Sequence, residues 1–129
     1  MGHARFLALY FLAGFAAAFL QVFISFDSLT PIIGASGAIA GVLGGYLVLF
    51  PRARVLTVVI VILFPLLVEL PAIFLLLVWF ASQFASGVAS LETGDALYGG
   101  VAYWGHIGGF IAGIVLALLL EPEHTTRNL

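Results

Sequence analysis

The fold of this chain is decided by residues 34–50, which read GASGAIAGVLGGYLVLF. No charged residue interrupts this stretch, and it approaches the roughly 20 apolar residues that cross a membrane as a helix. Glycine recurs at every fourth position, at Gly37, Gly41 and Gly45. Small residues at this spacing form a groove through which two helices in lipid approach closely. The stretch therefore predicts a membrane helix that packs tightly against a partner helix.

A second stretch, residues 105–120, has the same character and reads GHIGGFIAGIVLALLL. Its glycines also stand four residues apart, at Gly105, Gly109 and Gly113. We expect the two glycine stripes to pack on each other, with Gly41 and Gly45 facing Gly109 and Gly113. Ordinary membrane packing without any chemistry would leave the same pattern.

Composition agrees with a membrane protein. Of the 129 residues, 64% are hydrophobic and 8% are charged, whereas a soluble domain carries about 25% charged residues. The absence of cysteine excludes disulfides, thiolate chemistry and cysteine-based metal sites. A net charge of −2 and the lack of lysine argue against nucleic-acid binding.

The hydrophobic segments predict an all-α bundle of four membrane spans. The expected spans are residues 6–26, 32–50, 70–87 and 99–120. Residues 55–85 are too long for one upright helix, and prolines interrupt them, so we assign residues 55–64 to the membrane interface. Glu69 then lies at the start of the third span. There its carboxylate would complement the helix dipole, or it would take part in chemistry.

The arginines predict the orientation. Arg5, Arg52, Arg54 and Arg127 fall on one side of a four-span protein. The positive-inside rule places this side in the cytoplasm, together with both termini and a tail of residues 121–129. We expect a multi-pass protein of a bacterial or archaeal cell membrane. A cleaved signal peptide would also begin with a basic residue and an apolar run, but the run here is longer than a signal core.

Ser36 and His106 are the candidate catalytic residues. Each lies one to two turns inside the outer end of its span, so both reach a similar depth. Polar and ionisable groups inside membranes are costly and usually functional, and a hydroxyl beside an imidazole indicates a nucleophile and its general base. Ser36 as a small packing residue and His106 bonded to a backbone carbonyl are the structural alternatives.

The remaining chemistry follows from that pair. No acidic residue is placed to orient His106, so a dyad fits better than a triad. Free N–H groups at the helix start around Gly34, Ser36 and Gly37 would hold an oxyanion. A metal site is not expected, because His3 and His124 fall on the opposite side.

Four stretches resemble the rhomboid family of intramembrane serine proteases. They are MGHARFLALYFLAGFAAA at 1–18, GASGAIAGVLGGYLVLFPRARV at 34–55, ELPA at 69–72 and AYWGHIGGFIAG at 102–113. The resemblance implies that Ser36 is the nucleophile and His106 the base. It also implies cleavage of transmembrane proteins near their outer ends, in contact with membrane lipid and without a metal or organic cofactor.

The chain departs from the family pattern in two respects. Family members have six core spans, and this chain resembles the last four. We therefore expect the missing helices, which carry further oxyanion donors in the family, to come from the same protein or another polypeptide. Ala40 stands where some members place an aromatic ring against the histidine, so that support is expected to be missing.

Two other functional classes remain open. A non-catalytic rhomboid-like protein would bind transmembrane clients without cleaving them. A small transporter or channel component would explain glycine-rich spans and a buried histidine, but it predicts polar groups throughout the membrane thickness.

Overall fold

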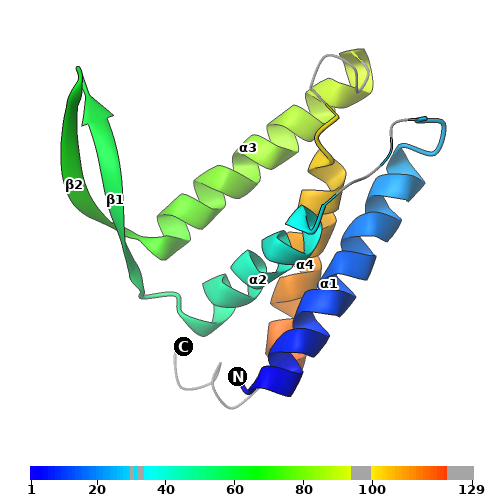
Figure 1. The fold of residues 1–129 in the computed structure, drawn as a ribbon, viewed down its shortest axis with the longest axis horizontal. Helices are drawn as coiled ribbons and strands as arrows, with labels where there is room; N and C mark the ends of the chain where they lie inside the picture. Colours follow the sequence, from blue (N-terminus) through cyan, green and yellow to red (C-terminus); the bar gives the residue numbers. More distant parts are fainter. Residues whose placement is uncertain (30, 32–33, 94–99, 122–129) are drawn as a thin grey trace.

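The computed structural model describes residues 1–29, 31, 34–93 and 100–121, which form four helices and one hairpin (Figure 1). The elements in chain order are α1 (His3–Ile24), α2 (Ser36–Leu49), β1 (Arg54–Val61), β2 (Phe64–Pro71), α3 (Ala72–Thr93) and α4 (Tyr103–Leu120). The predicted helical membrane bundle is confirmed.

Three of the described helices, α1, α3 and α4, are long and apolar enough to cross a membrane. The predicted span 32–50 is helical over Ser36–Leu49 within the described residues, and these 14 residues extend about 21 Å. A hydrocarbon core is about 30 Å thick. If α2 reaches one surface at Leu49, its first residue lies below the opposite surface.

The most extensive helix contact joins α2 and α4, and glycine makes it possible. A Cβ atom added to Gly113 would overlap the Gly41 carbonyl oxygen, and one added to Gly109 would overlap that of Gly37. Gly44 faces the Phe110 carbonyl oxygen in the same way. The two backbones therefore touch directly along the crossing, and no side chain fits between them.

Helix α1 packs its alanines into the same groove. The positions of Cβ atoms added to Gly37 and Gly41 are occupied by the side chains of Ala17 and Ala13. Gly45 differs, because its nearest neighbour is the Cδ1 atom of Leu9 at 3.2 Å. The other side of α1 exposes large apolar side chains, as expected of a surface in lipid: Phe11, Phe15 and Phe19.

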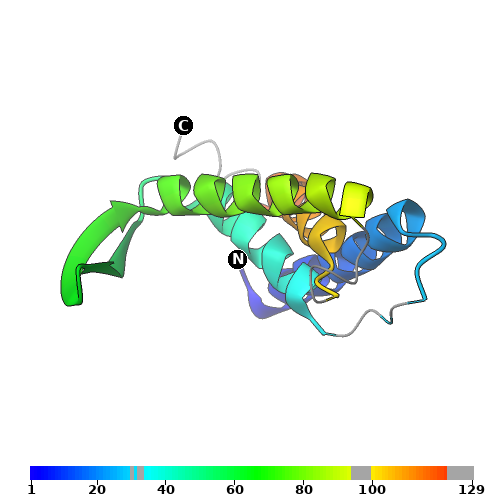
Figure 2. The same cartoon turned by 90° about the horizontal axis from the view of Figure 1, so that it is seen from above.

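Helix α3 lies along one side of the bundle (Figure 2). It joins the bundle through a cluster in which Leu76 of α3 meets Ala40 of α2 and Phe110 of α4. Its contacts with α4 and α2 are smaller than those between α2 and α4. Helix α3 is thus attached mainly by apolar side chains, without close backbone contact.

The region between α2 and α3 differs from the prediction. Residues 54–61 and 64–71 form an antiparallel hairpin that projects from the bundle, with Arg54 opposite Pro71 and Val61 opposite Phe64 (Figures 1 and 2). The segment 55–64 is therefore part of a hairpin that extends to Pro71, and the third long helix begins at Ala72. The cause is a run of β-branched residues in 55–61, which favours a strand.

Glu69 is accordingly not in the first turn of a helix. It lies exposed in β2, opposite Leu56, and the first turn of α3 contains no acidic residue. The expected role in complementing a helix dipole was therefore wrong.

Glu121 closes the opposite end of the bundle from Ser36. Its Oε1 atom accepts a hydrogen bond of 3.0 Å from Nη1 of Arg5, and the amino group of Met1 lies 3.6 Å away. The hydrogen bond from Arg5 holds the pKa of Glu121 below its usual value. This ion pair joins the start of α1 to the end of α4.

Candidate active site

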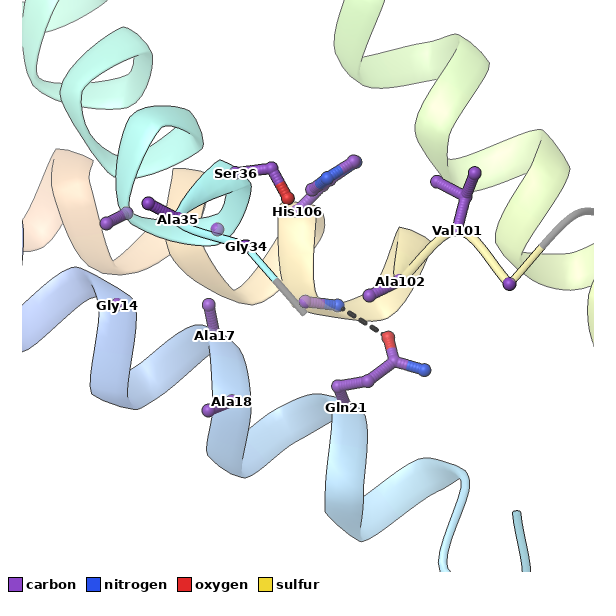
Figure 3. Close-up of a pocket in the computed structure, with 14 residues that line it drawn as sticks. Gly14, Ala17, Ala18, Gln21, Gly34, Ala35, Ser36, Val101, Ala102 and His106 are labelled. Carbon is purple, nitrogen blue, oxygen red and sulfur yellow. Dashed lines mark hydrogen bonds between the residues drawn. The ribbon is translucent and has the colours of Figure 1, made fainter. Parts of the chain in front are cut away.

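Ser36 and His106 line one cavity of about 320 Å³ at the ends of α1, α2 and α4. The cavity wall is formed mostly by glycine and alanine, with Gln21 as a further polar side chain (Figure 3). The similar depth expected for the two candidate residues thus corresponds to a shared cavity.

Ser36 is the first residue of α2, and the backbone before it determines its position. Gly34 has φ of +106°, a conformation that residues with a Cβ atom rarely adopt. The first hydrogen bond of the helix runs from the Ile39 N–H to the Ala35 carbonyl, at 3.0 Å. No side chain caps this helix start, so its first N–H groups are available to a ligand.

His106 lies in the first turn of α4, half-buried, where its N–H donates to the Ala102 carbonyl at 3.0 Å. Figure 3 shows the Ser36 hydroxyl pointing to the part of α4 that carries His106. No hydrogen bond joins the two side chains among those of the described residues. Hydrogen bonds between catalytic groups are often long in an empty site and shorten when substrate binds.

Gln83 of α3 is the hydrogen-bond partner of the imidazole. The distance between His106 Nδ1 and Gln83 Oε1 is 2.6 Å. Gln83 is not among the residues predicted from the sequence, because that prediction considers only acidic partners for the imidazole. The available signal was an amide side chain within an apolar helix, since such groups commonly bond across helices in lipid.

Two aromatic rings also contact the imidazole. The ring centroid of Trp79 on α3 lies 5.9 Å from that of His106, and the centroid of Tyr103 lies 6.5 Å away in an edge-on arrangement. The expected lack of aromatic support at Ala40 is therefore offset by Trp79 from another helix.

Gln21 of α1 secures the first turn of α4. Its buried Oε1 atom accepts a hydrogen bond of 2.8 Å from the N–H of Gly105, and its Nε2 atom donates to Ser25 Oγ at 3.1 Å. The residue before α4, Ala102, offers no side-chain cap, so Gln21 satisfies an N–H group that the helix leaves free. No local pattern in the sequence indicates this contact, which joins residues 84 positions apart.

The family model of the rhomboid domain matches residues 1–123. This chain belongs to the rhomboid family. The resemblance that the four sequence stretches indicated is thereby confirmed, and the family is one of intramembrane proteases. No match was found among curated proteins or among solved structures.

The rhomboid assignment and the three long apolar helices together identify an integral membrane protein. Arg5 lies in the first turn of α1 and bonds Glu121 beyond the end of α4, and Arg52 and Arg54 follow the end of α2, so all three lie remote from the helix starts that carry Ser36 and His106. Arg127, on which part of the predicted orientation rests, and His124 lie outside the described residues.

Proposed function

We propose that this rhomboid chain carries the Ser36–His106 dyad of an intramembrane serine endopeptidase. The observation that supports it best is the single cavity lined by a serine hydroxyl and an imidazole, each in the first turn of its helix. Polar groups at membrane depth are costly and commonly mark functional sites.

In the first half of the reaction, the Ser36 Oγ atom attacks the carbonyl carbon of the scissile peptide bond. His106 takes the hydroxyl proton on the ring nitrogen that does not face Gln83, and a tetrahedral oxyanion forms. His106 then returns the proton to the leaving amine as the C–N bond breaks. An acyl-enzyme remains on Ser36.

Water completes the cycle. His106 removes a proton from a water molecule that attacks the acyl carbon, and then gives the proton to Ser36 Oγ as the ester bond breaks. The products are a carboxylic acid and the free hydroxyl.

The oxyanion is held at the start of α2. The N–H groups of Ser36 and Gly37 belong to its first turn, where no side-chain cap competes for them, and Gly34 shapes the turn that presents them. Loss of one such donor costs about 10²–10³-fold in rate in other serine proteases.

The substrates are transmembrane proteins that enter from the lipid. With the arginines in the cytoplasm, the dyad lies near the outer face, and cleavage falls near the outer end of the substrate span. A peptide bond must leave the helix of the substrate before Ser36 can attack it. Unwound backbone is costly in lipid, so the water-exposed end of the substrate span reaches Ser36 more readily than the hydrogen-bonded centre of the span.

The test is cleavage of a single-span reporter polypeptide in proteoliposomes. We expect wild type to cleave the reporter near its outer end, and Ser36→Ala and His106→Ala each to reduce the rate by about 10³-fold or more. Ser90→Ala is the matched control, because Ser90 is buried on α3 and donates only to the Gly87 carbonyl in this structure.

Equal cleavage by wild type and Ser36→Ala would refute the proposed nucleophile. Stable binding of the reporter without any cleavage would instead identify a non-catalytic protein that binds transmembrane clients.

A further inference from the structure

We propose that Gln83 is a positioning residue, which fixes the tautomer and the orientation of His106 as general base. This inference rests on the proposed function. It adds a third side chain, contributed by α3, to a site in which α2 and α4 supply the reacting groups.

The hydrogen bond is short and joins two helices. His106 Nδ1 and Gln83 Oε1 lie 2.6 Å apart, although the residues are 23 positions apart in the chain. This hydrogen bond links a side chain of α3 to a side chain of α4. Helix α3 also makes apolar and aromatic contacts with α4, such as that of Phe80 with Phe110.

A relay of hydrogen bonds orients the amide. Gln83 Nε2 donates to Ser82 Oγ at 3.3 Å, and the Ser82 hydroxyl donates to the Trp79 carbonyl at 2.6 Å. Because the amide nitrogen is engaged by Ser82, the carbonyl oxygen is the atom that faces the imidazole. The chain of donors therefore runs in one direction, from His106 to the backbone of α3.

This direction sets the histidine tautomer. An amide oxygen can only accept, so Nδ1 must carry the proton and Nε2 must keep its lone pair. A free lone pair at Nε2 is what a base needs to receive the Ser36 proton. The Trp79 ring, 5.9 Å from the imidazole, limits its rotation.

The use of an amide suits the surroundings. When His106 becomes protonated during the reaction, its Nδ1–H donates a charge-assisted hydrogen bond to the same oxygen, which strengthens the contact. A carboxylate would give a stronger partner, but it would place a second ionisable group within a membrane-spanning helix. Gln83 thus orients the base without a permanent charge.

A purely structural role, in which the hydrogen bond merely attaches α3 to α4, makes different predictions. The test measures inactivation of the full chain in membranes by a fluorophosphonate, with the maximal rate kinact separated from the half-saturating concentration KI. Gln83→Met removes the acceptor at similar length, Gln83→Glu keeps an oxygen in place, and Ser90→Ala is the control on the same helix.

We expect Gln83→Met to lower kinact by about 10- to 100-fold with KI unchanged, since general-base catalysis contributes about 10²–10⁴-fold and misorientation forfeits part of it. Gln83→Glu should retain kinact within a few-fold, and Ser90→Ala should match wild type. A wild-type kinact in Gln83→Met, or an equal loss in Gln83→Glu, would overturn the inference.

A second readout does not depend on activity. The ¹⁵N resonances of His106 should show a protonated Nδ1 and an unprotonated Nε2 in wild type, and Gln83→Met should change that pattern. If the fluorophosphonate never labels wild type but the ¹⁵N resonances show this pattern, the proposed function is refuted. Gln83 would then still be the group that orients the ring. The opposite tautomer in wild type would refute the role of Gln83.

Discussion

At the scale of single residues, the conformation of Gly34 determines where the nucleophile stands. Its φ of +106° lies in the region that residues with a Cβ atom avoid, yet among the described residues no atom beyond its chain neighbours lies within 4 Å of the position where a Cβ would be built. The requirement for glycine is therefore set by the backbone and not by crowding.

Because the requirement for glycine at position 34 comes from the backbone alone, Gly34→Ala tests the conformation of the turn. Backbone strain of about 1–2 kcal/mol should be relieved by a shift of the turn, which moves Ser36 away from His106. We expect reporter cleavage to fall about tenfold or more, with the unfolding midpoint of the protein little changed. Gly2→Ala is the control, because Gly2 has φ of −80° and, within the described part of the chain, no atom beyond its chain neighbours lies within 4 Å of an added Cβ. Cleavage at the wild-type rate by Gly34→Ala would contradict this account of the turn.

The contacts of Gln83 and Gln21 in the site could not be derived from the sequence. Ser36 and His106 are predictable because each opens a glycine-striped apolar segment, and the distance of each from the outer end of its predicted span relates their depths. Gln83 and Gln21 act across 23 and 84 positions, so their contacts depend on how whole helices are placed side by side. No local pattern encodes that placement.

At the scale of elements, the crossing of α2 and α4 depends on particular glycines. Gly45 and Gly113 occupy equivalent positions in the four-residue spacing of glycines, but their surroundings in the structure differ. Gly113 faces the backbone of Gly41, whereas Gly45 faces the end of the Leu9 side chain, which can change its rotamer. A stripe of small residues in the sequence therefore marks the interface without identifying the points of closest approach.

This difference predicts opposite outcomes for two similar substitutions. Gly113→Ala should destabilise the protein by about 1–3 kcal/mol, because α2 and α4 must move apart to admit the methyl group. Gly45→Ala should be nearly neutral, since displacement of Leu9 is offset by the better helix propensity of alanine. The measurement is the free energy of unfolding in mixed micelles. Equal effects of the two substitutions would contradict the observed crossing.

The hairpin shows the limit of hydrophobicity as a guide to element type. Residues 55–64 are predominantly apolar, which favours a place at the membrane interface but does not by itself distinguish a strand from a helix. The turn adds to the difficulty, because Ile62 and Leu63 both have positive φ, where asparagine and glycine are usual. Neither residue signals a hairpin turn from the sequence.

At the scale of the whole molecule, the site is assembled from all four helices. Helix α2 supplies Ser36, α4 supplies His106, α3 supplies Gln83, and α1 holds the first turn of α4 through Gln21. The direct backbone contact of α2 with α4 keeps the first two close, while α3 is attached by smaller contacts. Reactivity at Ser36 is therefore a property of the assembled bundle.

The measurement that tests this account most directly is fluorophosphonate labelling of the chain in membranes, with the adduct located by mass spectrometry. A fluorophosphonate reacts with a serine whose hydroxyl is activated by a neighbouring base. The account predicts a single adduct on Ser36 in wild type and none in His106→Ala, with both proteins folded and inserted. An adduct on another serine, or undiminished labelling of Ser36 in His106→Ala, would contradict it.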